Sequence, residues 1–201
     1  AIVSSAYSKE PAIPVLVVLA SINAPWADMA ACAVFSAAAI TDYFDGKIAR
    51  ERGAVSGFGR MLDPIADKLL VGAALMLLAG YGRLSDAGLF PAIVIMLREI
   101  LVSGLREFLA ELRIGLPVTP LAKWKTGFQM GALGTLLAGD SGAPVIGLGF
   151  LPVSLIGEGM LWAAAVLTLI TGWDYLRAGL SLVQGETPAG SDTAAKPPGQ
   201  S

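Results

Sequence analysis

The sequence predicts an all-α, polytopic integral membrane protein with six transmembrane helices. Its 201 residues are 55% hydrophobic and 15% charged, with a mean hydropathy of +0.67. Soluble domains average about 45–50% apolar and about 25% charged residues. With a net charge of −2, nothing in the composition suggests nucleic-acid binding.

The apolar residues gather in runs that predict the helices, because a spanning helix needs roughly 20 mostly apolar residues. The runs cover residues 11–23, 26–48, 61–80, 88–112, 126–138 and 155–176. The first and fifth runs are short, and the fifth contains glycines spaced for close helix contact, Gly127, Gly131 and Gly134. We expect residues 1–10 to be a polar N-terminal segment, residues 11–178 to form the membrane domain, and residues 179–201, rich in Pro, Gly, Ser, Thr and Ala, to be a disordered tail.

The distribution of Lys and Arg predicts the orientation, because cytoplasmic loops carry an excess of these residues. With the N-terminus in the cytoplasm, the outer loops hold only Arg83. The cytoplasmic ends then hold Lys9, Lys47, Arg50, Arg52, Arg60, Lys68, Arg113, Lys123, Lys125 and Arg177.

The chain contains no histidine, which excludes Ser-His-Asp and Cys-His nucleophilic schemes and zinc sites with His ligands. A bound metal would therefore be held mainly by oxygen ligands. Carboxylates are the obvious candidates, and they suit Mg²⁺ or Mn²⁺.

Four aspartates, Asp42, Asp45, Asp63 and Asp67, stand close together in this apolar chain. A helix turns by about 100° per residue, so each pair shares one face of its helix. The connection between the two helices is short, which makes them antiparallel neighbours. We therefore expect the four carboxylates to converge between the second and third helices at the cytoplasmic side.

Four carboxylates in one small site repel one another, and two divalent cations would neutralise them. Paired metals about 3.5–4 Å apart are a known arrangement for displacement at phosphorus. Gly46, Ala49 and Gly59 share the aspartate faces and leave room for a bulky ligand, and Arg50 can bind a phosphate through two hydrogen bonds. The alternative is that the aspartates cap helices or pair with nearby Lys and Arg. Four carboxylates interleaved with small residues favour the metal site.

The pattern Asp-x2-Asp-Gly-x2-Ala-Arg-x8-Gly-x3-Asp-x3-Asp, from Asp42 to Asp67, resembles the signature of the CDP-alcohol phosphotransferases. The resemblance implies six transmembrane helices and usually a homodimer. It also implies transfer of a substituted phosphate from a CDP-linked donor to an alcohol, with release of CMP.

The same resemblance implies residue roles. Asp42, Asp45 and Asp63 would bind two divalent cations, and Asp67 would reach the second cation and act as the catalytic base. The CDP contacts would come from Asp42, Gly46, Ala49, Arg50, Ser56 and Gly59.

Two further stretches, REILVSGLREFLAE at residues 98–111 and LAKWKT at residues 121–126, resemble bacterial phosphatidylglycerophosphate synthases. This resemblance covers about residues 11–175. It implies CDP-diacylglycerol and sn-glycerol 3-phosphate as substrates, phosphatidylglycerophosphate and CMP as products, and a bacterial inner-membrane location with the active site facing the cytoplasm. The acceptor phosphate needs cations of its own, and the candidates are Arg98, Arg106, Arg113, Lys123 and Lys125.

The candidate cations have a second interpretation, because Lys and Arg also anchor helix ends at the cytoplasmic surface. Arg98 lies too deep in an apolar run for that role and needs an interior partner. Glu99 and Glu107 can pair with the arginines beside them.

Three other functions stay open. Another family member, such as a cardiolipin synthase of the CDP-alcohol type or a phosphatidylserine or phosphatidylinositol phosphate synthase, would keep the metal site and change the acceptor. A divalent-cation transporter would also place carboxylates among small residues, but here all four aspartates gather at one membrane side. A lipid-binding relative without catalysis is the third.

Overall fold

The computed structural model describes residues 12–51, 57–111 and 120–183, and all regular structure in these ranges is helical. The elements are α2 (Ala12–Ser21), α3 (Pro25–Glu51), α4 (Gly57–Gly80), α5 (Asp86–Glu111), α6 (Pro120–Gly142), the 3₁₀ helix η1 (Ala143–Ile146) and α7 (Val153–Val183). Each predicted apolar run overlaps one of the α-helices. The all-α prediction is therefore confirmed for the described residues.

The helix ends differ from the predicted ends where charged residues interrupt the apolar runs. α6 begins at Pro120 and includes the basic segment before the predicted start at residue 126, because Pro suits the first turn of a helix and Lys is a good helix former. α7 continues to Val183, so residues 179–183 are helical although the sequence predicts a tail there. Residues 1–10 and 184–201 lie outside the described residues.

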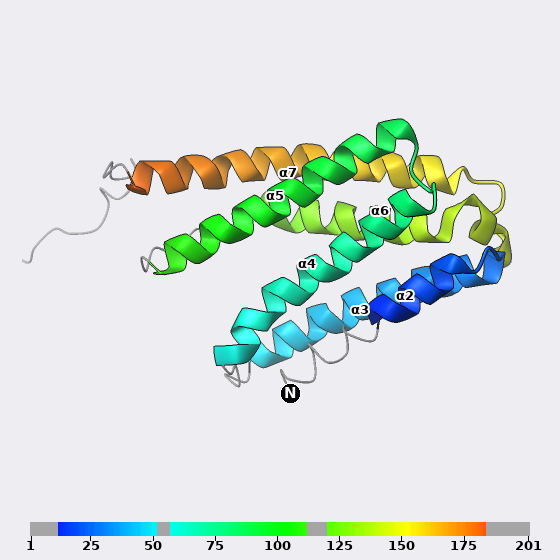
Figure 1. The fold of residues 1–201 in the computed structure, drawn as a ribbon, viewed down its shortest axis with the longest axis horizontal. Helices are drawn as coiled ribbons and strands as arrows, with labels where there is room; N and C mark the ends of the chain where they lie inside the picture. The colour runs from blue at the N-terminus through cyan, green and yellow to red at the C-terminus, as the bar shows by residue number, and fades with distance from the viewer. Residues whose placement is uncertain (1–11, 52–56, 112–119, 184–201) are drawn as a thin grey trace, which may run out of the picture.

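The helices run alternately in opposite directions between two ends of the molecule (Figure 1). The end of α3, the start of α4, the end of α5 and the end of α7 lie at one end, which we call the motif end because α3 and α4 carry the aspartates there. The connections from α2 to α3, α4 to α5 and α6 to α7 lie at the other end, which we call the loop end.

Helix α6 lies at the centre of the core, where it packs against α3, α4 and α7. Phe35 from α3, Leu133 from α6 and Leu161 from α7 are fully buried together. Two glycines bring α6 and α7 close together. A Cβ at Gly131 would lie 2.5 Å from Met160 Cε, and one at Gly157 would lie 2.7 Å from Leu136 Cγ. The predicted close contact is thus confirmed at Gly131, whereas Gly127 has open space beside it.

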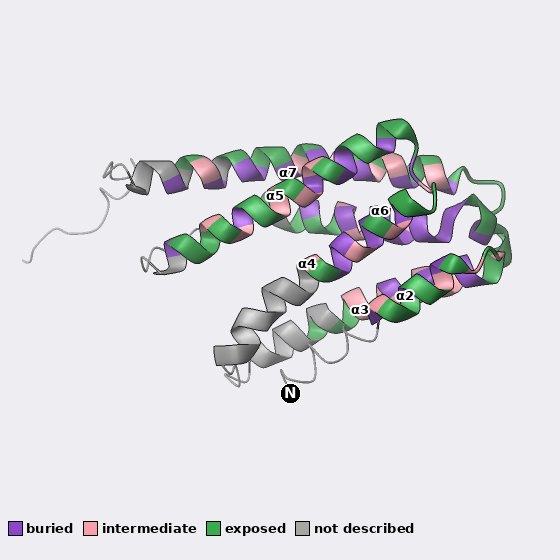
Figure 2. Cartoon of the chain, in the orientation of Figure 1, coloured by how far each residue is buried: buried purple, intermediate pink, exposed green. Residues whose placement is uncertain are grey.

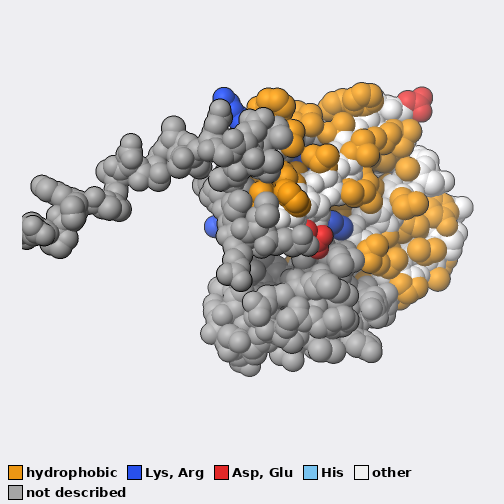
Figure 3. Space-filling view, turned by 60° about the vertical axis from the view of Figure 1, so that its left-hand side comes forward, with side chains coloured by type: hydrophobic (Ala, Val, Ile, Leu, Met, Phe, Trp, Pro, Cys, Tyr) orange, Lys and Arg blue, Asp and Glu red, His pale blue; other side chains and the backbone are white. Residues whose placement is uncertain are grey.

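The outer faces of the helices are strongly apolar. Residues on the outside are exposed and those facing α6 are buried (Figure 2), and hydrophobic side chains cover much of the described face in the space-filling view (Figure 3). The segments Asp86–Leu109 and Val153–Arg177 are long and apolar enough to cross a membrane, and only 28% and 33% of them is buried. That low burial distinguishes them from the core helices of soluble proteins. The described helices are consistent with an all-α membrane protein.

Candidate active site

The four aspartates fall on two helices joined by residues 52–56. α3 carries Asp42 and Asp45 near its end, and α4 carries Asp63 and Asp67 near its start. With a rise of 1.5 Å per residue, Asp45 and Asp63 both lie roughly 9 Å from the connected helix ends, and Asp42 and Asp67 both lie roughly 14–15 Å from them. Each aspartate of α3 is therefore about as far from the connected helix ends as one aspartate of α4, and these ends lie at the motif end (Figure 1).

The side chains of the motif residues lie outside what the structure describes, as do Ser56 and Arg113 entirely. The metal ligands and CDP contacts therefore stay predictions. The motif residues with a described helical backbone are Asp42, Asp45, Gly46, Ala49, Arg50, Gly59, Asp63 and Asp67.

Arg98 on α5 extends its guanidinium toward α7. Its Nη2 donates to Thr171 Oγ1 at 2.8 Å, its Nη1 donates to Glu99 Oε1 at 3.2 Å, and its Cζ lies 5.9 Å from the centre of the Tyr175 ring. Gly172 makes room for this side chain, because a Cβ there would lie 3.1 Å from Arg98 Cγ. The prediction that Arg98 needs an interior partner is confirmed, and the described partners come from two helices.

Glu99 joins α5 to α6. Its Oε1 accepts hydrogen bonds from Lys125 Nζ and from Arg98 Nη1. Lys125 is only 7% exposed, so it is an interior cation and not a surface anchor. One carboxylate thus partly neutralises the buried Lys125 and the half-buried Arg98, which is the arrangement that burial of charge requires.

The predicted acceptor cations fall into three groups. Arg98 and Lys125 meet around Glu99. Arg106 and Lys123 are exposed, as surface anchors would be. Arg113 lies outside the described residues. The structure therefore supports Arg98 and Lys125 as the interior members of the set.

A small cavity of about 30 Å³ lies between α4, α5 and α6, next to this ion pair. Lys68, which directly follows Asp67, is one of its lining residues. Gln129 is another; it is 4% exposed, and its Oε1 is buried with no hydrogen-bond partner among the described residues. The lining consists of Lys68, Val71, Met96, Glu99, Lys125, Thr126, Gln129 and Met130.

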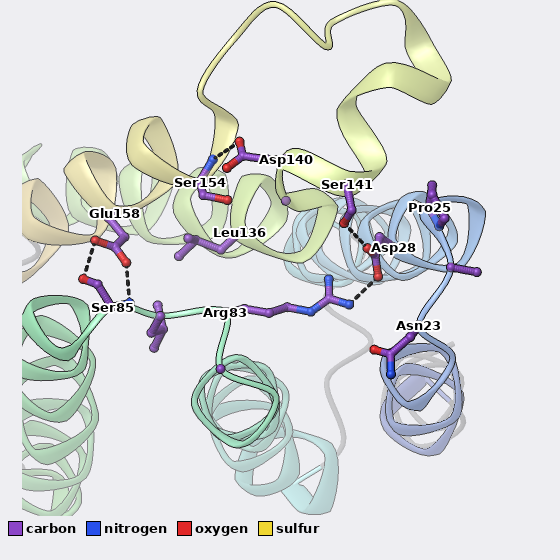
Figure 4. Close-up of a pocket in the computed structure, with 14 residues that line it drawn as sticks. Asn23, Pro25, Asp28, Arg83, Ser85, Leu136, Asp140, Ser141, Ser154 and Glu158 are labelled. Carbon is purple, nitrogen blue, oxygen red and sulfur yellow. Dashed lines mark hydrogen bonds and ion pairs between the residues drawn. The ribbon is translucent and has the colours of Figure 1, made fainter.

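A much larger cavity of about 600 Å³ lies at the loop end (Figure 4). Asp28 accepts hydrogen bonds there from Arg83 Nη2 and from Ser141 Oγ, and Arg83 Nη1 donates to the Leu137 carbonyl at 2.9 Å. These contacts tie α3, the α4–α5 connection and the end of α6 together.

Two further contacts at the loop end hold the starts of α5 and α7 (Figure 4). Glu158 accepts from Ser85 N–H at 2.6 Å and from Ser85 Oγ at 2.7 Å. Asp140 accepts from Ser154 N–H at 2.9 Å, and this hydrogen bond holds the pKa of the Asp140 carboxyl below its ordinary value. These polar groups cap helices and join loops at the end of the molecule opposite the aspartate motif.

A family model described as CDP-alcohol phosphatidyltransferase matches residues 11–170. The chain belongs to this family. It is 49% identical over 167 residues to the CDP-diacylglycerol–glycerol-3-phosphate 3-phosphatidyltransferase of Rickettsia bellii, a match that covers 83% of this chain and 88% of the relative. Proteins with the same name from Cereibacter sphaeroides (39% identical, covering 81% and 86%) and Salmonella choleraesuis (39%, covering 83% and 87%) are also similar. The resemblance drawn from the aspartate motif is thereby confirmed.

Three residues near the candidate site of this CDP-alcohol phosphatidyltransferase escaped the sequence analysis. Gln129 could have been identified from the sequence, because it stands four residues after Lys125 and so lies on the same face of the helix. Thr171 and Tyr175 are spaced in the same way on α7, but nothing in that apolar run singles them out as partners of an arginine on α5.

Proposed function

We propose that this protein transfers a phosphatidyl group from CDP-diacylglycerol to sn-glycerol 3-phosphate, giving phosphatidylglycerophosphate and CMP. The observation that carries the proposal is the set of aspartates at matching distances from the connected ends of α3 and α4, within a complete family motif. The names of the relatives support this donor and this acceptor. They favour glycerol 3-phosphate over the other alcohols used within such a family.

The motif fits two divalent cations, Mg²⁺ or Mn²⁺. Two aspartates on α3 and two on α4 would offer the ions four carboxylates, whose oxygens are the ligands that these ions prefer. Asp42, Asp45, Asp63 and Asp67 would hold the ions. When bound, the ions would supply positive charge for the diphosphate of the donor and for the leaving CMP.

The residues of the chain then have separate tasks. Gly46, Ala49 and Gly59 leave space for the cytidine nucleotide beside the helix backbones, and Arg50 and Ser56 bind its polar groups. Asp67 takes the proton from the attacking hydroxyl of the acceptor. The hydroxyl oxygen bonds to the β-phosphorus as the bond from that phosphorus to the bridging oxygen breaks, and CMP leaves with that oxygen.

The interior cations suit the phosphate of the acceptor. Arg98 and Lys125 reach the same carboxylate from α5 and α6, so they are held in place before a ligand arrives. Arg106, Arg113 and Lys123 belong to the same basic end and would attract the dianion from solution.

The protein would cross the inner membrane six times, with the motif end in the cytoplasm. The alternating helices (Figure 1) and the two long apolar segments support this topology. Lys68, Lys123, Lys125 and Arg177 belong to the motif halves of their helices, whereas Arg83 lies at the loop end, as the positive-inside rule requires. The water-soluble acceptor and CMP would then meet the site from the cytoplasm, while the acyl chains of the donor stay in lipid. We include a homodimer in the proposal because the family resemblance implies one.

The test is CMP release from CDP-diacylglycerol by the purified protein in detergent with Mg²⁺, with and without sn-glycerol 3-phosphate. We expect release that depends on the acceptor and on the metal. Asp67→Asn should reduce it by at least about a hundredfold, the scale of a lost general base. Asp86→Asn is the matched control, because Asp86 is an exposed aspartate at the start of α5, away from the motif.

CMP release that requires a different alcohol would overturn the assignment of glycerol 3-phosphate as the acceptor but leave the proposed type of reaction intact. Full activity of Asp67→Asn would overturn the role of the base. Metal-dependent ion flux in vesicles, without CMP release, would favour a transporter.

A further inference from the structure

We propose that Gln129 recognises the hydroxyl group of the acceptor that is not attacked, and so determines which alcohol phosphates the enzyme accepts. This inference rests on the function proposed above. Its starting point is the carboxamide oxygen of Gln129, which is buried without a hydrogen-bond partner among the described residues. Buried polar atoms in proteins are almost always paired with protein groups or ordered water, so an unpaired one beside a cavity indicates a missing partner there, and we assign that partner to the acceptor.

The cavity limits the size of that group. Its volume is about 30 Å³, and a water molecule needs roughly 10–15 Å³ of such space. One or two groups the size of water fit, whereas a phosphate with its four oxygens does not. A hydroxyl group also suits the amide chemically, because it both donates and accepts a hydrogen bond and can satisfy either end of the carboxamide.

The surrounding charges favour a neutral group over an anion. Lys125 is paired with Glu99, and Lys68 has an interaction partner of its own. Among the described residues that line the cavity, Gln129 Oε1 is the buried side-chain atom without a hydrogen-bond partner. A phosphate bound by Arg98 and Lys125 would lie outside this cavity, which is too small to hold it.

The position of the cavity places the hydroxyl near the reacting atoms. Lys68 lines the cavity and directly follows Asp67 on α4. The acceptor carries its two hydroxyls on adjacent carbon atoms. In this proposal one hydroxyl is held at Asp67, and the hydroxyl on the next carbon enters the cavity and binds the Gln129 amide. Lys125 and Gln129, four residues apart, present their side chains on the same face of α6.

The experiment compares two acceptors with CDP-diacylglycerol and Mg²⁺: sn-glycerol 3-phosphate, and 3-hydroxypropyl phosphate, which lacks the middle hydroxyl. With the wild-type protein we expect kcat/KM for the analogue to be lower by roughly 10- to 100-fold, the effect of leaving a buried polar group unpaired. Gln129→Met keeps the length of the side chain and removes the amide. It should lower kcat/KM for glycerol 3-phosphate by a similar factor and bring the two acceptors within about threefold of each other.

Met130→Leu is the matched control, because Met130 lines the same cavity without a hydrogen-bonding amide. It should keep the wild-type preference between the two acceptors. The unfolding transition of each variant in detergent shows whether it is folded. If Gln129→Met does not fold, Gln129→Leu, which also removes the amide, takes its place with the same expected outcome.

Equal use of both acceptors by the wild-type protein would overturn the inference and leave the proposed function intact. An equal loss of kcat/KM with both acceptors in Gln129→Met would also overturn the inference, because Gln129 would then bind an internal water molecule or serve only in packing. A wild-type protein that releases no CMP with glycerol 3-phosphate would overturn the proposed function, and this inference with it.

Discussion

Replacing Arg83 with methionine tests whether the loop end is held together by its buried ion pair. The change removes the cation beside Asp28 and the donor to the Leu137 carbonyl, while it keeps most of the apolar stem of the side chain. Ser141 would then be the described donor left to the Asp28 carboxylate.

The expected loss is large because the carboxylate is buried. The side chain of Asp28 is 5% exposed and that of Arg83 is 18% exposed. Removing one partner of a buried ion pair costs about 3–5 kcal/mol, and the partial exposure of Arg83 favours the lower half of that range. We therefore expect the free energy of unfolding to fall by about 3–4 kcal/mol. Replacing both partners, in Asp28→Leu/Arg83→Met, should recover at least about 2 kcal/mol, because no buried charge is left unpaired.

The free energy of unfolding can be measured by titrating SDS into detergent micelles and following helix content by circular dichroism. Arg177→Met is the control, because Arg177 is an exposed arginine on α7 and its removal should change the free energy by less than about 0.5 kcal/mol. A loss of less than about 1 kcal/mol in Arg83→Met, or a double variant no more stable than the single one, would refute this account of the loop end.

Two further changes probe packing and capping. Gly157→Ala should destabilise the protein by about 1–3 kcal/mol, because the new Cβ would lie 2.7 Å from Leu136 Cγ. The control is Gly159→Ala, which has open space beside it and should be neutral or stabilising by up to about 1 kcal/mol. Equal effects of the two changes in the same SDS titration would contradict the close α6–α7 contact. The hydrogen bond from Ser154 N–H lowers the pKa of Asp140 from 3.8, so the carboxylate stabilises the fold above its unfolded pKa, and this contribution is lost as the pH falls through the lower folded pKa. Since Asp140 is exposed, its contribution to the free energy of unfolding is below about 1 kcal/mol. Asp140→Asn should reduce the difference in unfolding free energy between about pH 6 and about pH 3. An unchanged difference would argue against a stabilising hydrogen bond from Ser154 N–H to Asp140.

The existence of the helices was predictable because apolar runs and their charged borders are local features of the sequence. The ends of the helices were less predictable. The start of α6 at Pro120 depends on helix propensity and not on hydropathy, so the apolar run begins too late. The aspartate motif was predictable for the same local reason, since its residues lie within one helical hairpin.

Contacts between distant segments were not predictable in the same way. Arg98 needs a polar partner because it is buried, but the choice of Thr171 depends on how α5 packs against α7. The pair of Arg83 and Asp28 depends likewise on the meeting of a loop with the start of α3. Hydropathy and spacing identify which residues need partners, and only the packed helices determine who the partners are.

The central position of α6 affects how this enzyme can change during evolution. α6 packs against three other helices and also carries Lys125 and Gln129. In many enzymes specificity lies on surface loops, where substitutions cost little stability. If Lys125 and Gln129 bind the acceptor as proposed, a new acceptor preference would require substitutions at buried positions of the helix that organises the core, where most changes destabilise the fold. Shifts of acceptor among such enzymes should therefore be accompanied by compensating changes on the neighbouring helices.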